Sequence, residues 1–431
     1  MTPHAHLAAA ADILDRIRSG RAPAEGVLKD WGRQNRYAGS KDRRAIADRV
    51  YKCLRAQARL AHLMQDESGR ALVIGSLALI DGLAIDAISE AFSGVGYAPS
   101  PLTDEERRRI SADPGEAPAW LEAGLPGFVA DRLKTVYGDQ WLTEAEALML
   151  PRAPIDLRVN GDDRDSLKQG LEMLGYKPAL TPFSALGLRL PSEPPPNVRA
   201  LPAFGQGRIE IQDEGSQLAG FLVGAEPGMT VVDYCAGGGG KTLAMLQAMG
   251  GQGRLIASDV EKTRLNNIRP RLKRAGLEAD LRQLGADGEG MEDLVGLADR
   301  VLVDAPCSGS GVWRRRPETA HALTEAEVLR LHALQVTILK RAARLVKPGG
   351  RLVYATCSIL PDENEQSAAA FASAHPEFTP LPLDAALAVP QISPDGARQL
   401  SILANGGHML RLSPAATQTD GFFVALFERK A

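Results

Sequence analysis

The stretch MTVVDYCAGGGGKT, residues 229–242, decides the fold class of this chain. Its apolar start predicts a buried strand, and four consecutive glycines, Gly237–Gly240, follow directly in a loop. Glycine allows a tight turn and a close approach of the backbone to a ligand. A strand that leads through such a loop into a helix is typical of a doubly wound α/β sheet, which binds ligands at the carboxyl ends of its strands.

The alternation of strand and helix continues from residue 207 to residue 431. Apolar runs predict further strands, and amphipathic runs such as residues 324–347 predict the helices between them. These strand-like runs are RLIASD (254–259), ADRVLVDAP (298–306) and GGRLVYATC (349–357). The pattern predicts a Rossmann-like, mainly parallel sheet with helices on both faces. The run GFFVALFER (421–429) predicts a late antiparallel strand at or near an edge.

Residues 1–147 predict an all-helical domain. In the segment 41–60, Ile46, Val50 and Leu54 recur at helical spacing between charged residues. Ser40 is placed to cap the start of this helix, and Gly20 closes an earlier one.

Residues 148–206 have a different character. IDLRVN (155–160) and LGLRL (186–190) alternate like strands, and a helix-like run between them ends at Gly175. We therefore expect a small α/β module that links the helical domain to a catalytic domain at residues 207–431.

Bulk properties limit the class of protein. The formal net charge is −3, yet residues 1–60 carry thirteen Lys and Arg against six Asp and Glu. This local surplus fits a phosphate-binding face or a solvated helix surface equally well. The apolar run 71–80 is about half the roughly 20 residues of a membrane span, so it predicts a buried helix. The N-terminus lacks the features of a secretory signal. We expect a cytoplasmic protein without a membrane span.

The four cysteines are scattered and form no CxxC pair or zinc spacing: Cys53, Cys235, Cys307 and Cys357. This spacing argues against a disulfide framework and gives no reason to expect a metal. Three of the four follow predicted strands, and a thiol at a strand end that faces a loop is more often reactive than a buried one. The role of Cys53 stays open.

The loop at residues 235–241 predicts a nucleoside-bearing cofactor. The next strand ends at Asp259, about 20 residues on, where an acidic residue can bind a ribose hydroxyl pair. A phosphate-binding loop is the alternative for GGGGKT, but that motif needs glycine at the position that Cys235 occupies. A purely structural glycine turn is a further alternative.

The runs DAPCSGSG (304–311) and YATCS (354–358) should bring Asp304, Cys307 and Cys357 to the edge of the sheet that carries the glycine loop. This set fits methylation of carbon 5 of cytosine. A thiolate that adds to carbon 6 makes carbon 5 nucleophilic. An acidic group such as Asp304 can protonate or hydrogen-bond ring N3, and a base must later remove the carbon 5 proton.

These motifs resemble those of the RsmB/Sun family of RNA cytosine-5 methyltransferases over nearly the whole chain. DYCAGGGGKT is similar to the family's cofactor loop, DAPCSGSG to its first cysteine motif and TCS to its second. KPGGRLVYATCSILPDENE, TDGFFVALFER and GRIEIQDEGSQLAG also match the family's style. The combination of the two cysteine motifs is highly specific, whereas the glycine loop alone is not.

The resemblance implies S-adenosyl-L-methionine as the cofactor and a role for each site residue. Cys357 would be the nucleophile, Cys307 would assist product release, and Asp304 would contact the cytosine and the methyl donor. The implied cofactor loop is Cys235, Ala236, Gly237, Gly238, Gly239, Gly240 and Lys241, with Asp259 at the ribose and Asp287 near the adenine. One departure is that the family's usual proline is absent from Ala236-Gly237-Gly238, which puts cofactor affinity in doubt more than activity.

The resemblance also implies an RNA partner, with 16S rRNA as the expected target, and a NusB-like RNA-binding domain at the N-terminus. We expect a monomer. Arg314, Arg315 and Arg316 follow DAPCSGSGVW closely, so we expect them beside the catalytic edge as RNA-binding residues; a solvated charge run is the alternative.

Three other functions remain open. A tRNA cytosine-5 methyltransferase would share the same motifs. A DNA cytosine-5 methyltransferase would take its nucleophile from a proline-cysteine pair like Pro306-Cys307, but Cys357 favours the RNA type. A non-catalytic ribosome-assembly factor that keeps the fold predicts the loss of a cysteine, the aspartate or the loop lysine, and all are present.

Overall fold

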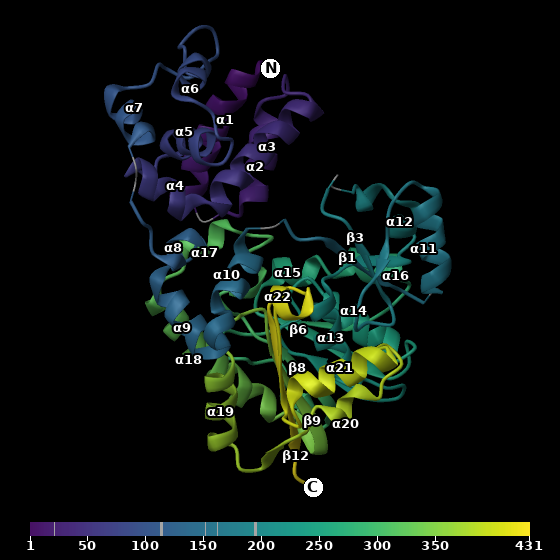
Figure 1. The fold of residues 1–431 in the computed structure, drawn as a ribbon. Coiled ribbons are helices and arrows are strands. Elements are labelled where there is room, and N and C mark those ends of the chain that lie inside the picture. Colours follow the sequence, from purple (N-terminus) through teal and green to yellow (C-terminus); the bar gives the residue numbers. More distant parts are fainter. Residues whose placement is uncertain (21, 113–114, 151, 162, 194–195) are drawn as a thin grey trace. The chain divides into compact units, whose positions relative to one another are not determined.

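The computed structural model describes residues 1–20, 22–112, 115–150, 152–161, 163–193 and 196–431. The chain divides into two compact units. One comprises Met1–Pro151 and Val312–Leu323, and the other comprises Arg152–Gly311 and Thr324–Ala431. The first unit therefore includes a short segment from the middle of the catalytic sequence. The second unit contains both the small α/β module and the large sheet (Figure 1).

Every regular secondary-structure element among the described residues of the first unit is a helix. Its helices are α1 (Pro3–Ser19), α2 (Ala24–Gln34), α3 (Ser40–Arg55), α4 (Gln57–Met64), α5 (Gly69–Leu79), α6 (Ile85–Ala91), α7 (Asp104–Ser111), α8 (Ala119–Glu122), α9 (Gly127–Tyr137), η1 (Gly138–Gln140), α10 (Trp141–Met149) and α17 (Glu318–Ala322). The short helix η4 (Ser310–Val312) lies where the chain passes between the units. These bounds confirm the helical N-terminal region.

The core of this unit forms as the sequence pattern predicts. Ile46, Val50 and Leu54 of α3 are buried in it, and α5 is buried over nearly its whole length. The start of α3 differs from the prediction, because Ser40 is its first helical residue and does not cap it. Asp42 instead accepts a hydrogen bond from the Gly39 N–H at 2.9 Å. A carboxylate in the first turn also interacts favourably with the helix dipole, so Asp42 stabilises the start of α3 in two ways.

Cys53 belongs to the same core. Its side chain is fully buried, and burial raises the pKa of its thiol to about 11. The thiolate is the reactive form of cysteine, so burial and the raised pKa both disfavour reaction at Cys53.

The small module is a four-stranded antiparallel sheet with the order β2-β3-β1-β4. Its elements are β1 (Ile155–Val159), α11 (Arg164–Met173), β2 (Ala179–Leu180), β3 (Gly187–Leu190), η2 (Val198–Ala200), α12 (Pro202–Gly205) and β4 (Ile209–Ile211). Strand β4 pairs with β1, so this sheet extends to Ile211, beyond the expected boundary at residue 206.

The large sheet has eight strands, ordered β10-β12-β9-β8-β5-β6-β7, with β11 paired to β12. The strands are β5 (Thr230–Asp233), β6 (Arg254–Asp259), β7 (Asp280–Gln283), β8 (Ala298–Asp304), β9 (Val346–Thr356), β10 (Phe378–Pro380), β11 (Met409–Leu412) and β12 (Phe422–Arg429). Strands β5 to β9 are parallel, and β12 is antiparallel to β9. The expected parallel sheet and its late antiparallel strand are thus confirmed.

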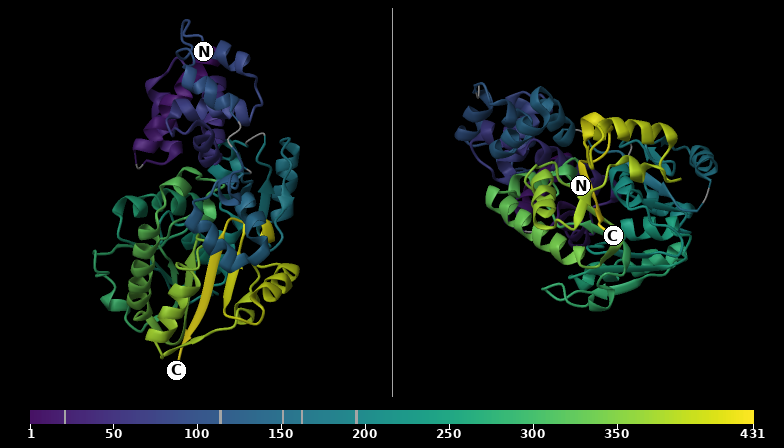
Figure 2. Two further views of the ribbon diagram at one scale, coloured as in Figure 1. Left: turned by 60° about the vertical axis from the view of Figure 1, so that its left-hand side comes forward. Right: turned by 90° about the horizontal axis from the view of Figure 1, so that it is seen from below.

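Helices cover both faces of this sheet (Figures 1 and 2). They are α13 (Glu214–Phe221), α14 (Gly240–Ala248), α15 (Lys262–Asn266), α16 (Arg269–Ala275), η3 (Glu292–Leu294), α18 (Glu325–Ala343), α19 (Glu365–Ala374), α20 (Asp384–Leu387), α21 (Pro394–Ala404) and α22 (Pro414–Thr417). Successive strand residues alternate between two cores: Val353 packs with α13, α14 and α21, and Tyr354 packs with α18 and α19. This alternation follows from the two-residue period of a strand.

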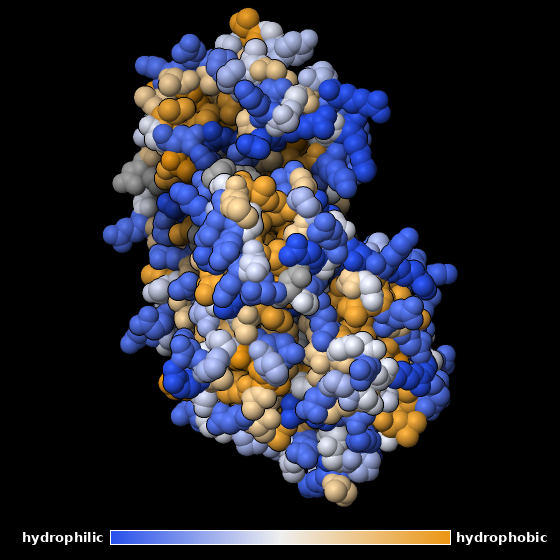
Figure 3. Space-filling view, turned by 90° about the vertical axis from the view of Figure 1, so that its right-hand side faces the viewer, coloured by the Kyte–Doolittle hydropathy of each residue, from blue (hydrophilic) through white to orange (hydrophobic). Residues whose placement is uncertain are grey.

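Hydrophilic side chains dominate the face shown in Figure 3, with hydrophobic patches between them. Amphipathic helices that turn their apolar stripes inward produce such a surface.

Across the described residues, no helix combines the length and the apolar character needed to cross a lipid bilayer.

Candidate active site

The expected site residues gather at the carboxyl edge of the parallel strands. Cys235 follows β5 by two residues, Cys307 follows β8 by three, and Cys357 directly follows β9. Strand β8 lies between β5 and β9 in the sheet, so the three loops leave from adjacent positions. The topology therefore explains how residues more than a hundred positions apart in sequence meet at one edge.

Cys307 and Cys357 lie in contact. Their Sγ atoms are 3.4 Å apart, both thiols are free, and both side chains are partly exposed. The hydrogen bond with Cys357 raises the pKa of Cys307 well above its ordinary value, and burial adds to the shift. Either sulfur can donate the hydrogen in this contact.

A buried carboxylate connects the two cysteine loops. Glu363 is fully buried, and its Oε1 accepts the Ser308 N–H at 2.8 Å. Its Oε2 accepts the hydroxyl groups of Ser308 and Ser358, each at 2.5 Å. Each serine directly follows one of the cysteines, so a single side chain fixes both loops. Gln335 adds a bond to Glu363 at 3.1 Å and one to the carbonyl of Pro306 at 3.0 Å.

Lys241 and Asp304 form an ion pair at the same edge. Lys241 Nζ donates to Asp304 Oδ2 at 2.7 Å and lies 5.1 Å from the centre of the Phe422 ring. Burial alone would lower the pKa of Lys241, but the Asp304 carboxylate outweighs it, and the pKa lies above its ordinary value. The lysine is therefore a stable cation beside Asp304, a partner that the sequence did not identify.

The glycine loop has a backbone that only glycine adopts easily. Gly237 and Gly239 have φ of +53° and +78°, in the left-handed region. A Cβ atom at Gly239 would also lie 2.8 Å from Ile268. The loop therefore needs glycine for its shape, and it leads into the N-terminus of α14, where unpaired N–H groups favour an anionic or polar ligand.

Asp259 lies at the end of β6, as expected for a ribose ligand, and its side chain is buried. Its Oδ2 accepts the Gly237 N–H at 3.0 Å, and its Oδ1 accepts the Glu261 N–H at 2.9 Å. Asp259 therefore also holds the glycine loop against β6. These features fit a nucleoside cofactor in two ways: a glycine cradle lies beside the helix start, and an acidic side chain lies at the next strand end.

The other two expected cofactor residues have different environments. Burial raises the pKa of the Cys235 thiol well above its ordinary value, and Asp259 adds to the shift, so the thiolate form of Cys235 is disfavoured. Asp287 lies in the loop after β7; its side chain is 87% exposed and 3.4 Å from Arg341. The same loop approaches the residue after β5, since a Cβ at Gly288 would lie 2.7 Å from the Tyr234 hydroxyl.

The three arginines after the first cysteine motif have unequal exposure. They lie in residues 312–323, which pack with the N-terminal helices. Arg314 is 5% exposed, and its carbonyl accepts a bond from Arg55 at 3.5 Å. Arg315 is partly buried, and Arg316 is exposed with Glu318 3.9 Å away. Of the three, Arg316 is the residue that we retain as a candidate phosphate ligand.

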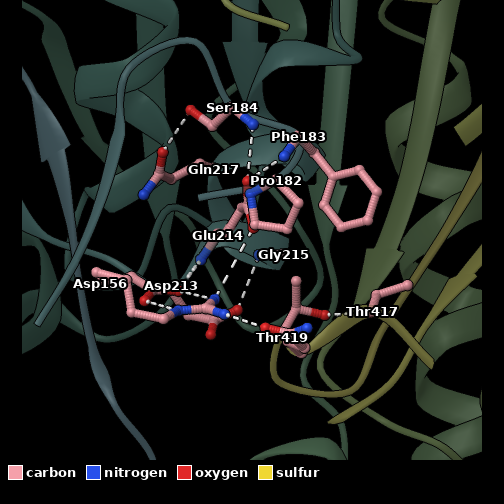
Figure 4. Close-up of polar contacts among 12 residues, drawn as sticks. Asp156, Pro182, Phe183, Ser184, Asp213, Glu214, Gly215, Gln217, Thr417 and Thr419 are labelled. Carbon is pink, nitrogen blue, oxygen red and sulfur yellow. Dashed lines mark hydrogen bonds and ion pairs between the residues drawn. The ribbon is translucent and has the colours of Figure 1, made fainter. Parts of the chain in front are cut away.

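A buried polar cluster fixes the stretch that leads into α13 (Figure 4). Glu214 Oε1 accepts the N–H groups of Phe183 and Ser184, both at 2.7 Å, and Asp156 Oδ2 accepts the Glu214 N–H at 3.1 Å. Asp213 caps α13 and accepts the Asp420 N–H at 3.0 Å. The cluster ties the small sheet to both α13 and the loop before β12, which explains why the sequence QDEGSQ is rich in polar residues.

Comparison with known proteins agrees with this geometry. The family described as "16S rRNA methyltransferase RsmB/F" matches residues 221–428. Ribosomal RNA small subunit methyltransferase B of Cronobacter sakazakii is 34% identical over 320 residues, which cover 73% of this chain and 68% of that protein.

Solved structures of similar fold include a methyltransferase homolog. The crystal structure of PH0851 has a TM-score of 0.77 at 26% identity and covers 100% of this chain and 99% of that one. A methyltransferase homolog protein from Pyrococcus horikoshii has a TM-score of 0.58 at 29% identity and covers 72% of this chain and 97% of that one. The glycine loop, the paired cysteines and these similarities lead to one conclusion: the chain belongs to the RsmB/F family of S-adenosylmethionine-dependent rRNA methyltransferases.

Proposed function

We propose that this chain methylates carbon 5 of a cytosine in 16S rRNA, with Cys357 as a covalent nucleophile and Cys307 as the residue that resolves the adduct. The observation that carries the proposal is the contact of the two thiols, 3.4 Å apart, at the sheet edge that also holds the glycine loop and the Lys241–Asp304 pair. Two adjacent thiols are needed when one must attack the base and the other must assist its release.

The reaction needs a nucleophile because carbon 5 of cytosine is poorly nucleophilic. The Cys357 thiolate adds to carbon 6, and the electron pair of the 5,6 double bond becomes available at carbon 5. Bound S-adenosylmethionine supplies the methyl group. A base then removes the proton from carbon 5, the double bond forms again, and Cys357 leaves carbon 6 as a thiolate.

Cys307 suits the second half of this sequence. The hydrogen bond with Cys357 and burial raise the pKa of Cys307, so its thiolate, where it forms, is a stronger base than an ordinary cysteine thiolate. Its position beside Cys357 places its sulfur next to the adduct, where the thiolate form can accept the proton that leaves carbon 5. The family resemblance assigns attack to Cys357 and assistance in release to Cys307, and the contact of the two thiols supports that assignment.

The Lys241–Asp304 pair suits recognition of cytosine. An Asp304 carboxylate paired with Lys241 can accept a hydrogen bond from the exocyclic amino group of cytosine. Uracil has a carbonyl oxygen at that position and would face the carboxylate with a second acceptor. When the bound base covers Asp304, a carboxylate oxygen that faces another acceptor costs about 1–3 kcal/mol, enough to favour cytosine over uracil.

RNA is the proposed partner, and exposed basic residues offer phosphate contacts. The segment 33–44 of the N-terminal unit has five basic residues and one acidic residue, and Tyr37 within it is exposed. Arg316 follows Cys307 by nine residues in the sequence. We propose that these residues bind the RNA backbone, which would offset the few kcal/mol needed to unstack the target base.

Transfer of a labelled methyl group tests this function. The purified protein is incubated with labelled S-adenosylmethionine and with 16S rRNA, tRNA or duplex DNA, and the modified nucleoside is identified by mass spectrometry. We expect 5-methylcytidine in 16S rRNA. Label in tRNA or in DNA instead would show that the substrate is that nucleic acid and not 16S rRNA. The 16S rRNA is also supplied within assembling small subunits. If no label enters any of these substrates, the protein is better explained as a non-catalytic assembly factor.

A further inference from the structure

Two arginines from outside the parallel strands hold the glycine loop by its carbonyl groups. Arg158, in β1 of the small sheet, donates from Nη1 to the Gly240 carbonyl at 2.8 Å. Arg271, in α16, donates from Nη1 to the Gly238 carbonyl. The two residues are 82 and 33 positions away from the glycines that they contact, so tertiary packing places them there.

The position of Arg158 is energetically demanding. Its side chain is fully buried, and burial lowers its pKa to about 9, so the guanidinium still carries its charge at neutral pH. It also donates to Gln212 and to Asn160, yet its Nη2 has no hydrogen-bond acceptor among the described residues. A buried charge with incomplete pairing is costly, and such costs are concentrated at functional sites.

Arg271 is oriented by a buried carboxylate. Glu210 of β4 accepts from Nε of Arg271 at 3.2 Å and from Nη2 at 2.9 Å, and it also pairs with Arg274. Because Glu210 occupies these two nitrogens, Nη1 is the donor that faces the Gly238 carbonyl. Paired contacts of this kind fix the plane of a guanidinium group.

A fixed carbonyl also fixes the N–H of the next residue. The peptide group is planar, and in its trans form the carbonyl and the following N–H point in opposite directions. Arg271 therefore supports the peptide orientation in which the Gly239 N–H donates to the Ala236 carbonyl at 2.8 Å. Arg158 sets the Lys241 N–H at the start of α14. Four consecutive glycines would otherwise lose much conformational entropy when the cofactor orders them.

We propose that Arg158 and Arg271 are positioning residues that order the glycine loop before S-adenosylmethionine binds and so raise its affinity. The inference rests on the cofactor of the family and not on the identity of the methylated base. It assigns the small α/β sheet a role in cofactor binding, because β1 and β4 provide Arg158 and the Glu210 that orients Arg271.

Calorimetric titration of the full chain with S-adenosylmethionine tests the proposal without any RNA. In Arg271→Ala we expect the Kd to rise about tenfold, the scale of one lost hydrogen bond from a charged donor. Arg269→Ala is the matched control, because Arg269 is an exposed residue of the same helix. A Kd that is equal in Arg271→Ala, Arg269→Ala and the unmodified protein would overturn the proposal.

A second substitution separates loop ordering from general damage. Gly238 lies outside the left-handed region, and a Cβ there would approach only Arg271 Nη1, at 3.6 Å. Alanine at this position reduces the freedom of the unbound loop. Added to Arg271→Ala, Gly238→Ala should therefore lower the Kd for S-adenosylmethionine about two- to fivefold. Introduced alone into the unmodified protein, it should change the Kd much less. The absence of such recovery would refute the ordering argument.

Arg158 is tested by comparing the two kinetic constants. At saturating RNA, Arg158→Lys should raise the KM for S-adenosylmethionine while kcat at saturating cofactor stays within about twofold, because the loop takes the same shape once it is occupied. Urea unfolding is measured in parallel. If kcat falls while KM and the unfolding midpoint stay unchanged, Arg158 has a different role.

Discussion

The sulfur atoms of Cys307 and Cys357 lie 3.4 Å apart although 50 residues separate them in the sequence. The pairing of β8 with β9 brings the two strand ends together, and Glu363 holds the serine that follows each cysteine. The contact is therefore set by the sheet and by one buried carboxylate. It is the relationship on which the proposed division of catalytic roles depends.

Replacing Cys307 should trap the protein on its RNA. In Cys307→Ala, Cys357 can still attack carbon 6, but release of the adduct stalls, so a covalent complex should accumulate. On a denaturing gel with 16S rRNA substrate, Cys307→Ala should give a slowly migrating band. The double variant that combines Cys307→Ala with Cys357→Ala should lack this band. A band of equal intensity in both variants would mean that another residue forms the adduct.

Removing the charge of Glu363 should loosen the contact between the cysteines. Glu363→Gln replaces an acceptor of four hydrogen bonds, and hydrogen bonds to a charged group contribute about 1.5–3 kcal/mol each, so we expect turnover to fall at least about tenfold. The rate at which diamide oxidises Cys307 and Cys357 to a disulfide, measured by mass spectrometry, should fall with it.

Glu365→Gln is the control for this prediction, because Glu365 is a neighbouring carboxylate that pairs with Arg411 at the surface. A Glu363→Gln protein with normal turnover and a normal rate of disulfide formation would show that the cysteine loops keep their positions without the carboxylate.

The cluster around Glu214 should make stability depend on pH. Burial raises the pKa of Glu214 to about 7 from an ordinary 4.5, so the folded protein binds this proton more tightly than the unfolded chain does. The contribution of Glu214 to stability therefore decreases as the pH rises from about 4.5 to about 7, and the full penalty applies above that window.

Urea unfolding of Glu214→Gln and the unmodified protein at pH 5 and pH 8 measures this effect. From pH 5 to pH 8, the free energy of unfolding of the unmodified protein should fall by about 2–3 kcal/mol relative to that of the variant. Glu172→Gln, an exposed change on α11, should show no such trend. An equal difference between the proteins at both pH values would exclude titration of Glu214 in this range.

Neutralising Arg316 should weaken RNA binding in a salt-dependent way. Each lost phosphate contact should reduce the slope of log affinity against log salt by about 0.7–0.9. Filter binding of Arg316→Gln across a salt series measures the slope, and Arg330→Gln is an exposed control that pairs with Glu327. S-adenosylmethionine affinity should not change. An unaltered slope would remove Arg316 from the RNA contact surface.

The sequence predicted the sheet and the cysteine pair because both depend on local signals. Apolar strand runs identify β5, β6, β8 and β9, and parallel order brings their carboxyl ends to one edge. The thiols meet because each follows such a run closely. The glycine loop was predictable for the same reason, since its position after β5 defines its place in the fold.

The residues that hold these groups were not predictable in this way. Glu363 acts on Ser308 from 55 residues away, and Arg158 acts on Gly240 from 82 residues away. Their roles depend on which loops pack together, and an isolated Glu or Arg in a sequence predicts a solvated surface. The burial of Arg314 has the same origin, because it follows from packing of residues 312–323 with the N-terminal helices.

Methylation by Cys357→Ala measures the central claim most directly. Unmethylated 16S rRNA is incubated with S-adenosylmethionine and either the unmodified protein or the variant, and bisulfite sequencing then locates 5-methylcytosine at single-nucleotide resolution. We predict one new 5-methylcytosine with the unmodified protein and none with Cys357→Ala, although circular dichroism and cofactor affinity of the variant remain normal. The same 5-methylcytosine at an undiminished rate with Cys357→Ala would contradict covalent catalysis by Cys357.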